Sequence, residues 1–363
     1  MTICLFAHSW LSDWNHGNAH FLRGLASALV ARGHVVRCYE TGRPGWSLAH
    51  LKEESRGAAS VLQFRNIYPE LDLHFYDDAT DWPRTLGNAD IVVAHEWNPA
   101  SLFHALAAAR RRRHFRLLLH DTHHRAVSQE AAMAQLPLEE CDAVLAFGES
   151  LRRLYEQRGM RAFTLHEAAD ARRFHPAEGA GAAPAAWDMV WIGNWGDGER
   201  SREITEFLLE PAAALRLRTL VHGVRYPVSA QAELLRCGIR FGGYLPNLEA
   251  PALYHASRLA VHIPRRPYVE RLPGIPTIRM FEALACGATL LSGPWQDTEG
   301  LFAAGADFIS VRSKAEMAAT CKQLLADEGQ RKRVGQHGAE TILARHTCDD
   351  RARELEDICR NLD

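Results

Sequence analysis

Residues 3–39, ICLFAHSWLSDWNHGNAHFLRGLASALVARGHVVRCY, contain the pattern that decides the fold. The apolar run 3–7 ends in a polar loop that contains glycine. Apolar residues then recur at helical spacing, at Phe21, Leu22, Leu25 and Leu29. Gly33 stands where a helix C-terminus favours a left-handed residue, and a second apolar run starts at Val35. This strand–helix–strand order predicts a parallel sheet with a right-handed crossover.

The same alternation continues along the chain. Short apolar runs that predict strands lie at 91–94, 117–119, 143–147, 189–192, 218–222, 259–263 and 289–292. Residues 169–184 are instead rich in Ala, Gly and Pro without periodicity, which is typical of an interdomain linker. We therefore expect an α/β protein with two Rossmann-like, doubly wound domains. Because such sheets bind ligands beyond the carboxyl ends of their strands, we expect the two domains to face a cleft.

Composition narrows the class of protein. With 47% hydrophobic and 24% charged residues, the chain resembles an ordinary globular protein. A net charge of -2 argues against nucleic-acid binding, which needs a basic excess. No apolar run approaches the roughly 20 residues that cross a bilayer. The eight cysteines are scattered without a C-x-x-C pair, so we expect reduced thiols in a cytoplasmic protein.

Residues 273–287, PGIPTIRMFEALACG, predict a helix that begins near Pro276 and ends at Gly287. A helix start offers N–H groups and a positive dipole end to a phosphate. Arg279 adds a planar donor group that can reach a diphosphate. Glu282 lies roughly 9 Å further along the axis, where its carboxylate can accept two ribose hydroxyls. The alternative is a capped surface helix with an incidental Arg–Glu pair.

Arg265 and Arg266 follow another predicted strand directly. At a strand's carboxyl end they can supply cations to the same ligand, or they can be solvated arginines in a stiff surface turn. Tyr268 or Trp195 can stack on a base, although such aromatics usually pack against the protein. The basic run 110–113 ends an alanine-rich helix, where cations favour the dipole. A weak peripheral contact with an anionic membrane is the alternative reading of that run.

In the N-terminal half, three strand ends bring histidines and carboxylates to one rim. The residues concerned are His8, Asp13, Asn15, His16 and Gly17 after the first strand, His95, Glu96, Trp97 and Asn98 after the next, and His120, Asp121, Thr122, His123 and His124 after residues 117–119. Such groups suit an acceptor hydroxyl and its proton, which either Asp121 or Asp13 can receive. The histidines can instead be buried hydrogen-bonding residues. They can also ligate a metal for hydrolysis, although no H-E-x-x-H pairing exists.

The stretch PTIRMFEALACGATLLSGPW at 276–295, followed by TEGLF at 298–302, resembles the donor-binding region of glycosyltransferases with the GT-B fold. More narrowly, it resembles the CgeB-like branch. The closing RHTCDDRARELEDI at 345–358 resembles the end of that branch. The opening 9–34 resembles the first loop and helix of group 1 transferases. The likeness therefore reaches both halves of the chain.

The resemblance implies domains over 1–168 and 185–345, with a helix over 346–363 that returns to the first domain. It implies that Glu282 binds the donor ribose and that His120 contacts the donor sugar. It places the diphosphate on the loop Gly274, Pro276 and Thr277, with Gly17 in the first loop also on the donor side. Two departures stand out. The first of the family's two glutamates falls at Gly274, and the usual Arg and Lys after the domain's first strand are replaced by WIGNWGDGER, which offers Asn194 and Arg200.

We therefore expect a glycosyltransferase that moves a sugar from a nucleoside-diphosphate donor to a hydroxyl acceptor. The helix start near Pro276, with Arg279 and Arg265, would stabilise the leaving diphosphate, so we expect no metal and no cofactor. Retention of anomeric configuration follows from the resemblance alone. The acceptor, whether glycan, protein or small molecule, stays open. The alternatives are a sugar-nucleotide epimerase, a non-catalytic nucleotide-sugar binder and a metal-dependent hydrolase using the His120–His124 cluster.

Overall fold

The computed structural model describes residues 1–43, 45–177, 185–196 and 198–362. The chain divides into two compact units. Unit 1 comprises Met1–Glu167 together with Cys348–Asp363, and unit 2 comprises Ala168–Thr347. Each unit is built on one parallel β-sheet with helical connections, so the expected α/β class with two Rossmann-like domains is confirmed.

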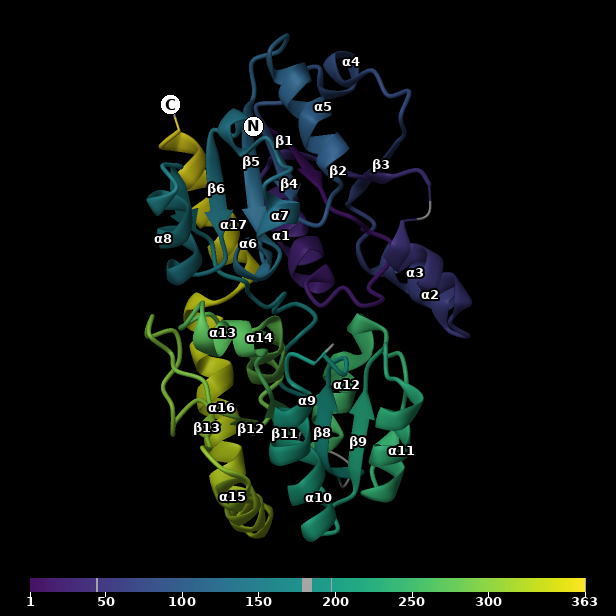
Figure 1. The fold of residues 1–363 in the computed structure, drawn as a ribbon, viewed down its shortest axis with the longest axis vertical. Coiled ribbons are helices and arrows are strands. Elements are labelled where there is room, and N and C mark those ends of the chain that lie inside the picture. The colour runs from purple at the N-terminus through teal and green to yellow at the C-terminus, as the bar shows by residue number, and fades with distance from the viewer. Residues whose placement is uncertain (44, 178–184, 197, 363) are drawn as a thin grey trace. The chain divides into compact units, whose positions relative to one another are not determined.

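Unit 1 contains a seven-stranded parallel sheet in the order β3-β2-β1-β4-β5-β6-β7 (Figure 1). Its strands are β1 (Thr2–Phe6), β2 (Val35–Thr41), β3 (Asp72–Tyr76), β4 (Ile91–His95), β5 (Arg116–Asp121), β6 (Ala143–Ala146) and β7 (Ala162–Thr164). Its helices are α1 (Ala19–Ala31), α2 (Trp46–Glu53), α3 (Gly57–Ile67), α4 (Trp82–Leu86), α5 (Ala100–Arg110), α6 (Arg125–Ser128), α7 (Glu130–Met133), α8 (Glu149–Gln157) and α17 (Cys348–Arg360). The strand order reverses direction between β1 and β4, where sheets of this kind bind ligands.

The central strands of unit 1 come from the apolar runs in the sequence. β1 and β4 are buried along their whole length, because helices cover both faces of a parallel sheet. β3 differs, since none of its residues is fully buried. It lies at the sheet edge and carries polar residues, which explains why sequence patterning did not predict it.

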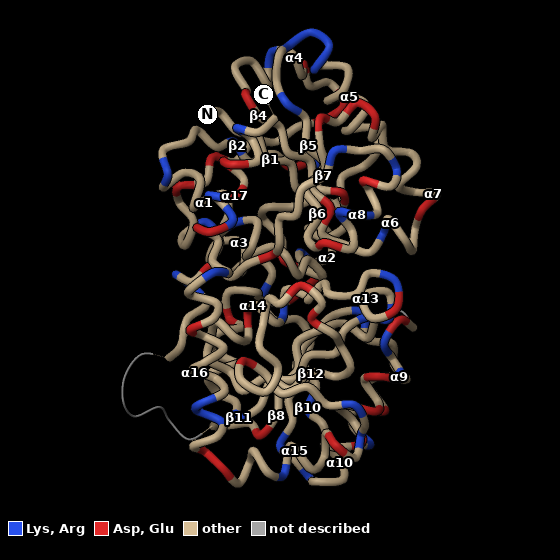
Figure 2. The backbone as a smooth tube through the Cα atoms, turned by 90° about the vertical axis from the view of Figure 1, so that its left-hand side faces the viewer, with Lys and Arg blue, Asp and Glu red and all other residues tan. Residues whose placement is uncertain are grey.

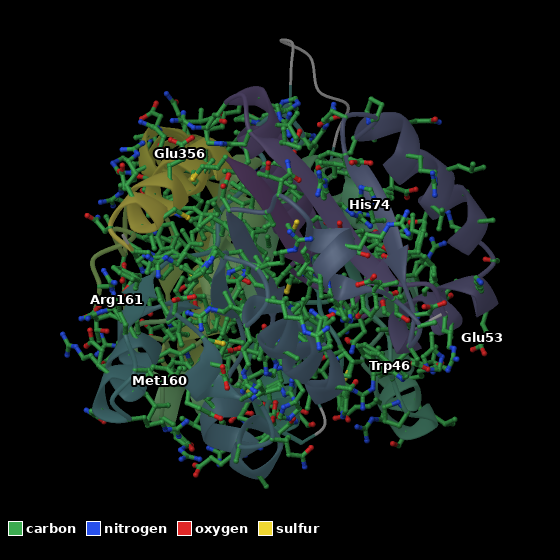
Figure 3. All side chains as sticks on the ribbon, turned by 90° about the horizontal axis from the view of Figure 1, so that it is seen from above. Trp46, Glu53, His74, Met160, Arg161 and Glu356 are labelled. Atoms are coloured by element: carbon green, nitrogen blue, oxygen red, sulfur yellow. The ribbon has the colours of Figure 1, made fainter. Side chains whose placement is uncertain are left out.

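The last helix, α17, packs against α1 within unit 1. It is the yellow helix beside the purple α1 in Figure 1, and Glu356 is labelled on it in Figure 3. Glu356 accepts a hydrogen bond from Arg32, with 2.6 Å between Nε and Oε1, and lies 2.8 Å from His34 Nε2. The hydrogen bond from Arg32 is the main cause that lowers the pKa of Glu356 to about 2. These contacts tie the end of the chain to the turn between α1 and β2.

Unit 2 contains a six-stranded parallel sheet in the order β10-β9-β8-β11-β12-β13. Its strands are β8 (Trp187–Ile192), β9 (Thr219–His222), β10 (Arg240–Phe241), β11 (Ser257–His262), β12 (Leu290–Ser292) and β13 (Ile309–Ser310). Its helices are α9 (Ser201–Ile204), α10 (Glu210–Ala214), α11 (Val228–Arg236), α12 (Ala250–His255), α13 (Arg266–Glu270), α14 (Ile278–Ala285), α15 (Lys314–Ala326) and α16 (Glu328–Arg345). A π-helical segment, Thr205–Leu209, joins α9 to α10. Here the strand order reverses between β8 and β11.

The structure differs from the expected linker over 169–184. Residues 178–184 lie outside the described residues. The preceding part packs into unit 2, where Ala169 pairs with Thr347 and Phe174 is fully buried. An aromatic side chain in an Ala- and Pro-rich stretch is enough to anchor it, because burying a ring removes a large apolar area from water.

Charged residues of both signs are scattered along the backbone of each unit (Figure 2). Two arginines of the basic run 110–113 are paired with acids. Arg110 donates to Asp142 at 2.5 Å, and Arg111 donates to Glu140. This pairing favours the reading as a charged helix end over a membrane contact. Among the described residues, no helix is both long and apolar enough to cross a membrane.

Helix α14 is held in place by a close approach of α16. A Cβ atom at Gly335, on α16, would collide with the carbonyl oxygen of Gly287, which ends α14 in the left-handed conformation. We expect Gly335→Ala to destabilise the protein by about 1–3 kcal/mol, because overpacking outweighs the better helix propensity of alanine. Urea unfolding measures the change. Gly329→Ala, near the start of the same helix, is the control and should be neutral or stabilising. Equal effects of the two variants would contradict the packing argument.

Candidate functional site

The loops after β8 and β11 meet at the point where the unit 2 sheet reverses its strand order. Asn194 follows β8, and its side-chain oxygen accepts hydrogen bonds from Arg200 and Arg265, each at 2.9 Å. Arg265, which follows β11, also forms an ion pair with Glu199. The structure therefore brings together Asn194 and Arg265, both expected at the site, and places Arg200 between them.

Arg200 is a buried cation with one donor atom that has no partner among the described residues. Its side chain donates to the backbone oxygens of Ile263 at 3.1 Å and Asn194 at 3.0 Å, and it lies over the Trp191 ring. Its Nε is buried, and no partner for it exists in the described ranges, nor does any described carboxylate form an ion pair with it. Burial, with the charge of Arg265 next, lowers the pKa of Arg200 to about 9. A buried cation of this kind is an incomplete site that an anion would satisfy.

Two glycines let Arg200 lie across the loop after β8. A Cβ atom at Gly193 would lie 2.8 Å from the Trp191 ring and 3.0 Å from Arg200 Nη2. A Cβ atom at Gly196, which has φ +91°, would come 3.1 Å from Arg200 Nε and still closer to Cγ. Any larger residue at either position would displace the guanidinium, so the glycines in WIGNWGDGER belong to the geometry of the cation.

Helix α14 begins two residues later than expected. Thr277 precedes it in an extended conformation, so Pro276 is not the first helical residue and the prediction was wrong in that detail. The Thr277 side chain does not cap the helix. Its hydroxyl instead lies 3.1 Å from His262 Nε2, at the end of β11. The side-chain cap that would occupy the helix start is therefore absent, which leaves this end suited to an anion.

His262 connects the two parts of the site. Its Nδ1 lies 2.8 Å from Ser292 Oγ, and burial lowers its pKa to about 3, with the charge of Arg200 adding to this effect. The imidazole is thus neutral at pH 7 and keeps Thr277 in position. Arg200 donates to the carbonyl oxygen of Ile263, the residue after His262, and His262 contacts Thr277, so the buried cation and the start of α14 lie in one neighbourhood.

Glu282 is fully buried on α14. One carboxylate oxygen accepts from Asn247 at 2.9 Å, and the other pairs with Arg279 one turn earlier. The contact of Arg279 with a diphosphate stays a prediction, and in this structure its Nη1 pairs with Glu282. A ligand ribose would have to share that oxygen with Arg279 or displace it. The Arg279–Glu282 pair expected for a capped surface helix is therefore present. Its acid, Glu282, is nevertheless buried, whereas both members of an ordinary surface pair are exposed.

The aromatic candidates for base stacking serve packing instead. Tyr268 is buried in α13, and the Trp195 ring lies 5.8 Å from that of Tyr226 within the core cluster of unit 2. Packing within unit 2 therefore accounts for the positions of both rings without a stacked base.

In unit 1, histidines end three adjacent strands. His8 follows β1, His95 ends β4 and His120 lies near the end of β5. The His95 and His120 ring centroids are 5.5 Å apart, and those of His8 and His95 are 6.1 Å apart. Burial lowers the pKa of His8 and of His120 to about 4. The strand ends thus gather neutral imidazoles, and His120 Nε2 finds no hydrogen-bond partner among the described residues.

The two carboxylates proposed as bases are both buried and engaged. Asp121 accepts hydrogen bonds from the Tyr155 hydroxyl at 2.6 Å and the His123 backbone N–H at 3.1 Å. Burial raises the pKa of Asp121 to about 6. Asp13 lies 4.0 Å from the guanidinium of Arg23, which is also buried. Hydrogen bonding and burial therefore give Asp121 a structural role, whether or not it also accepts a proton.

Gly17 is half-buried in the first loop, directly before α1. The adjacent Asn18 donates to Thr122 Oγ1 at 2.6 Å, and that hydroxyl lies 2.7 Å from His95 Nε2. This network joins the loop after β1 to the ends of β4 and β5. Across the described ranges, no group of three or more His, Cys, Asp or Glu side chains is arranged to hold a metal ion.

Sequence reasoning missed two members of the unit 2 site. His262 lies inside the predicted strand 259–263, where its apolar neighbours masked it. Its position one residue from the strand's carboxyl end was the available signal. Asn247 follows a proline in a loop, and nothing in the sequence connects it to Glu282, 35 residues away.

Comparisons with known proteins agree with this architecture. Residues 200–357 match a family model described as glycosyl transferase-like. A search of the curated proteins gives no significant match. Sucrose-phosphate synthase from Thermosynechococcus elongatus has a similar structure, with a TM-score of 0.68 at 16% identity, covering 100% of this chain and 99% of that chain.

Two further solved structures are similar over nearly their whole length. Anabaena HepE in complex with UDP and glucose gives a TM-score of 0.68 at 13% identity, covering 99% of each chain. T4 phage BGT in complex with its UDP-glucose substrate gives 0.63 at 12% identity, covering 100% of this chain and 99% of that chain. Another T4 phage BGT structure contains UDP and Mn²⁺. The fold is therefore that of GT-B glycosyltransferases, as the sequence predicted, and residues 200–357 match a glycosyl transferase-like family.

Proposed function

We propose that this chain transfers a sugar from a nucleoside-diphosphate donor to a hydroxyl acceptor, and that unit 2 binds the donor. The observation that carries the proposal is the buried Arg200, whose unsatisfied Nε lies in one neighbourhood with Arg265 and the uncapped start of α14. A diphosphate would compensate this charge. Because similar structures contain UDP or UDP-glucose, we propose UDP-sugars as the first donors to test.

The same groups suggest how the reaction proceeds. As the bond between the sugar and the diphosphate breaks, negative charge grows on the leaving oxygen. Arg200, Arg265 and the N–H groups at the start of α14 would stabilise that charge, and their positions are fixed before the reaction. With these cations available, we propose transfer without a divalent metal. Gly17, Gly274, Pro276 and Thr277 stay assigned to the donor, and the finer assignments to the CgeB-like branch and to a retaining mechanism rest on the sequence resemblance.

A donor screen tests the function. Thermal shifts are measured with UDP, GDP, dTDP and their glucose, galactose and N-acetylglucosamine derivatives, followed by release of free nucleotide with and without acceptor mixtures. Saturating a stabilising ligand at about 100 times its Kd should add roughly 2.7 kcal/mol of stability. Turnover unchanged by EDTA would support metal independence, whereas turnover that requires Mn²⁺ would contradict it. No shift with any nucleotide would overturn the proposal.

A non-catalytic nucleotide-sugar binder is the second candidate. It is favoured by the engagement of both candidate bases, Asp121 with Tyr155 and Asp13 with Arg23. Binding of a donor without turnover in any acceptor mixture would favour it over the transferase.

His120→Ala separates binding from turnover. We propose that the neutral His120, whose Nε2 has no partner in the described structure, orients the donor's sugar. Because misplacing a reacting group costs about 100-fold, turnover should fall by about that factor while the Kd for UDP changes by less than about twofold. His104→Ala, an exposed histidine of α5, is the matched control. Wild-type turnover in the His120 variant would remove this assignment.

A further inference from the structure

The turn before α14 has no room for a side chain at position 274. Gly274 is buried and has φ +92°, a conformation that L residues rarely adopt. A Cβ atom there would collide with the Thr298 hydroxyl oxygen. A glutamate at this position would thus be strained by the backbone conformation and would require the Thr298 side chain to move.

Another segment brings a carboxylate to the same place. Glu299 lies beside the turn, with its Cγ 3.3 Å and its Oε1 3.4 Å from the position of that Cβ atom. These are the distances of ordinary to tight van der Waals contact. The half-buried Glu299 therefore puts an acid against the Gly274 backbone from a loop that follows β12.

The loop that carries Glu299 is fixed on both sides. Asp297 accepts hydrogen bonds from the backbone N–H groups of Glu299 at 3.2 Å and Phe302 at 2.6 Å. The Trp295 indole N–H donates to the carbonyl oxygen of Ile275 at 3.0 Å, which joins the loop to the turn itself. Trp295 and Phe302 are buried. Such a fixed loop backbone can place a side chain for a ligand, because little backbone entropy remains to be lost on binding.

We propose that Glu299 recognises the donor's sugar by accepting hydrogen bonds from its hydroxyl groups. This inference rests on the proposed function, in which the diphosphate binds at the start of α14. The sugar is bonded directly to the diphosphate, and Gly274 is three residues from Thr277, at most about 11 Å of chain. A carboxylate accepts hydrogen bonds from hydroxyls and repels another carboxylate. The donor class is therefore a neutral, hydroxyl-bearing sugar rather than a uronic acid.

The test compares affinities for a nucleotide with and without its sugar. Isothermal titration gives the Kd of UDP, UDP-glucose and UDP-glucuronic acid for the wild type, Glu299→Ala and Glu299→Gln, or of the GDP or dTDP series if the donor screen selects that base. Both variants should bind the free nucleotide within about twofold of the wild type. In both variants, the ratio of the Kd of UDP to that of UDP-glucose should be about tenfold smaller than in the wild type. The ratio of the Kd of UDP-glucuronic acid to that of UDP-glucose should also fall. Glu340→Gln, an exposed acid on α16, is the control.

The outcomes separate two failures. If the wild type and the Glu299 variants gain the same affinity from the sugar, the Glu299 assignment is overturned and the proposed function stands. If the wild type binds no nucleotide, the proposed function fails and this inference fails with it. Should Glu299→Ala not fold, the near-isosteric Glu299→Gln, checked by its melting temperature, decides the question alone.

Discussion

Arg200→Ala is expected to weaken UDP binding by about 100-fold. Arg200 combines burial, a charge and a donor atom without a partner among the described residues. Hydrogen bonds to charged groups contribute about 1.5–3 kcal/mol, and about 2.7 kcal/mol corresponds to a 100-fold change in Kd. The loss should exceed that from Arg265→Ala, because Arg265 is already paired with Glu199. Isothermal titration with UDP measures both.

The Arg200 variant needs controls for folding and for charge. Arg202→Ala removes an exposed arginine two residues away on α9 and should leave the Kd unchanged. Arg200→Lys keeps a charge but loses the planar fork that reaches Asn194 and Ile263, so it should bind UDP about tenfold more weakly than the wild type. Melting temperatures identify variants that bind poorly because they are unfolded. If a folded Arg200→Ala protein binds UDP as tightly as Arg202→Ala does, Arg200 has only a structural role. The proposal that it binds the donor diphosphate is then wrong.

The fold was accessible from the sequence because its central strands are continuous apolar runs between helical repeats. The runs at 3–7 and 91–94 became β1 and β4, which pair in parallel and are buried along their whole length. The edge strands of the unit 2 sheet could not be predicted from the sequence. β10 and β13 are two residues long, and two residues carry no periodicity. Their pairing is decided by the neighbouring strand rather than by their own sequence.

The strand ends that carry the candidate residues were predictable from the sequence, but the contacts of those residues were not. Strand ends indicated Asn194 and Arg265 because topology fixes where carboxyl ends lie. The burial of Arg200 depends on Gly193 and Gly196 leaving space for it, and sequence patterns do not report such space. The start of α14 moved past Pro276 because Thr277 is extended and its hydroxyl meets His262 from another strand. Contacts between distant segments decided each of these details.

Glu282→Gln is expected to remove the ability to distinguish ribose from deoxyribose. If Glu282 accepts hydrogen bonds from the ribose hydroxyls, the wild type should bind UDP about tenfold more tightly than 2′-deoxyUDP, and the variant should bind both alike. The amide keeps one acceptor oxygen for Asn247, so the variant is milder than alanine, which would leave Asn247 and Arg279 without their buried partner. Isothermal titration with the two nucleotides gives the ratio for each protein.

The same experiment decides between the two readings of the Arg279–Glu282 pair. In the functional reading, Arg279 pairs with the Glu282 carboxylate only until a ribose binds to it. Arg279→Ala should then leave the carboxylate accessible and keep the preference for ribose. In the structural reading, the wild type binds UDP and 2′-deoxyUDP equally, and Glu282→Gln lowers the stability without changing their ratio. The full burial of Glu282 makes some loss of stability certain in either case, because an amide cannot form the ion pair with Arg279. Only the ratio of the two affinities therefore tests the ribose contact, since a general weakening of the fold would lower both affinities together.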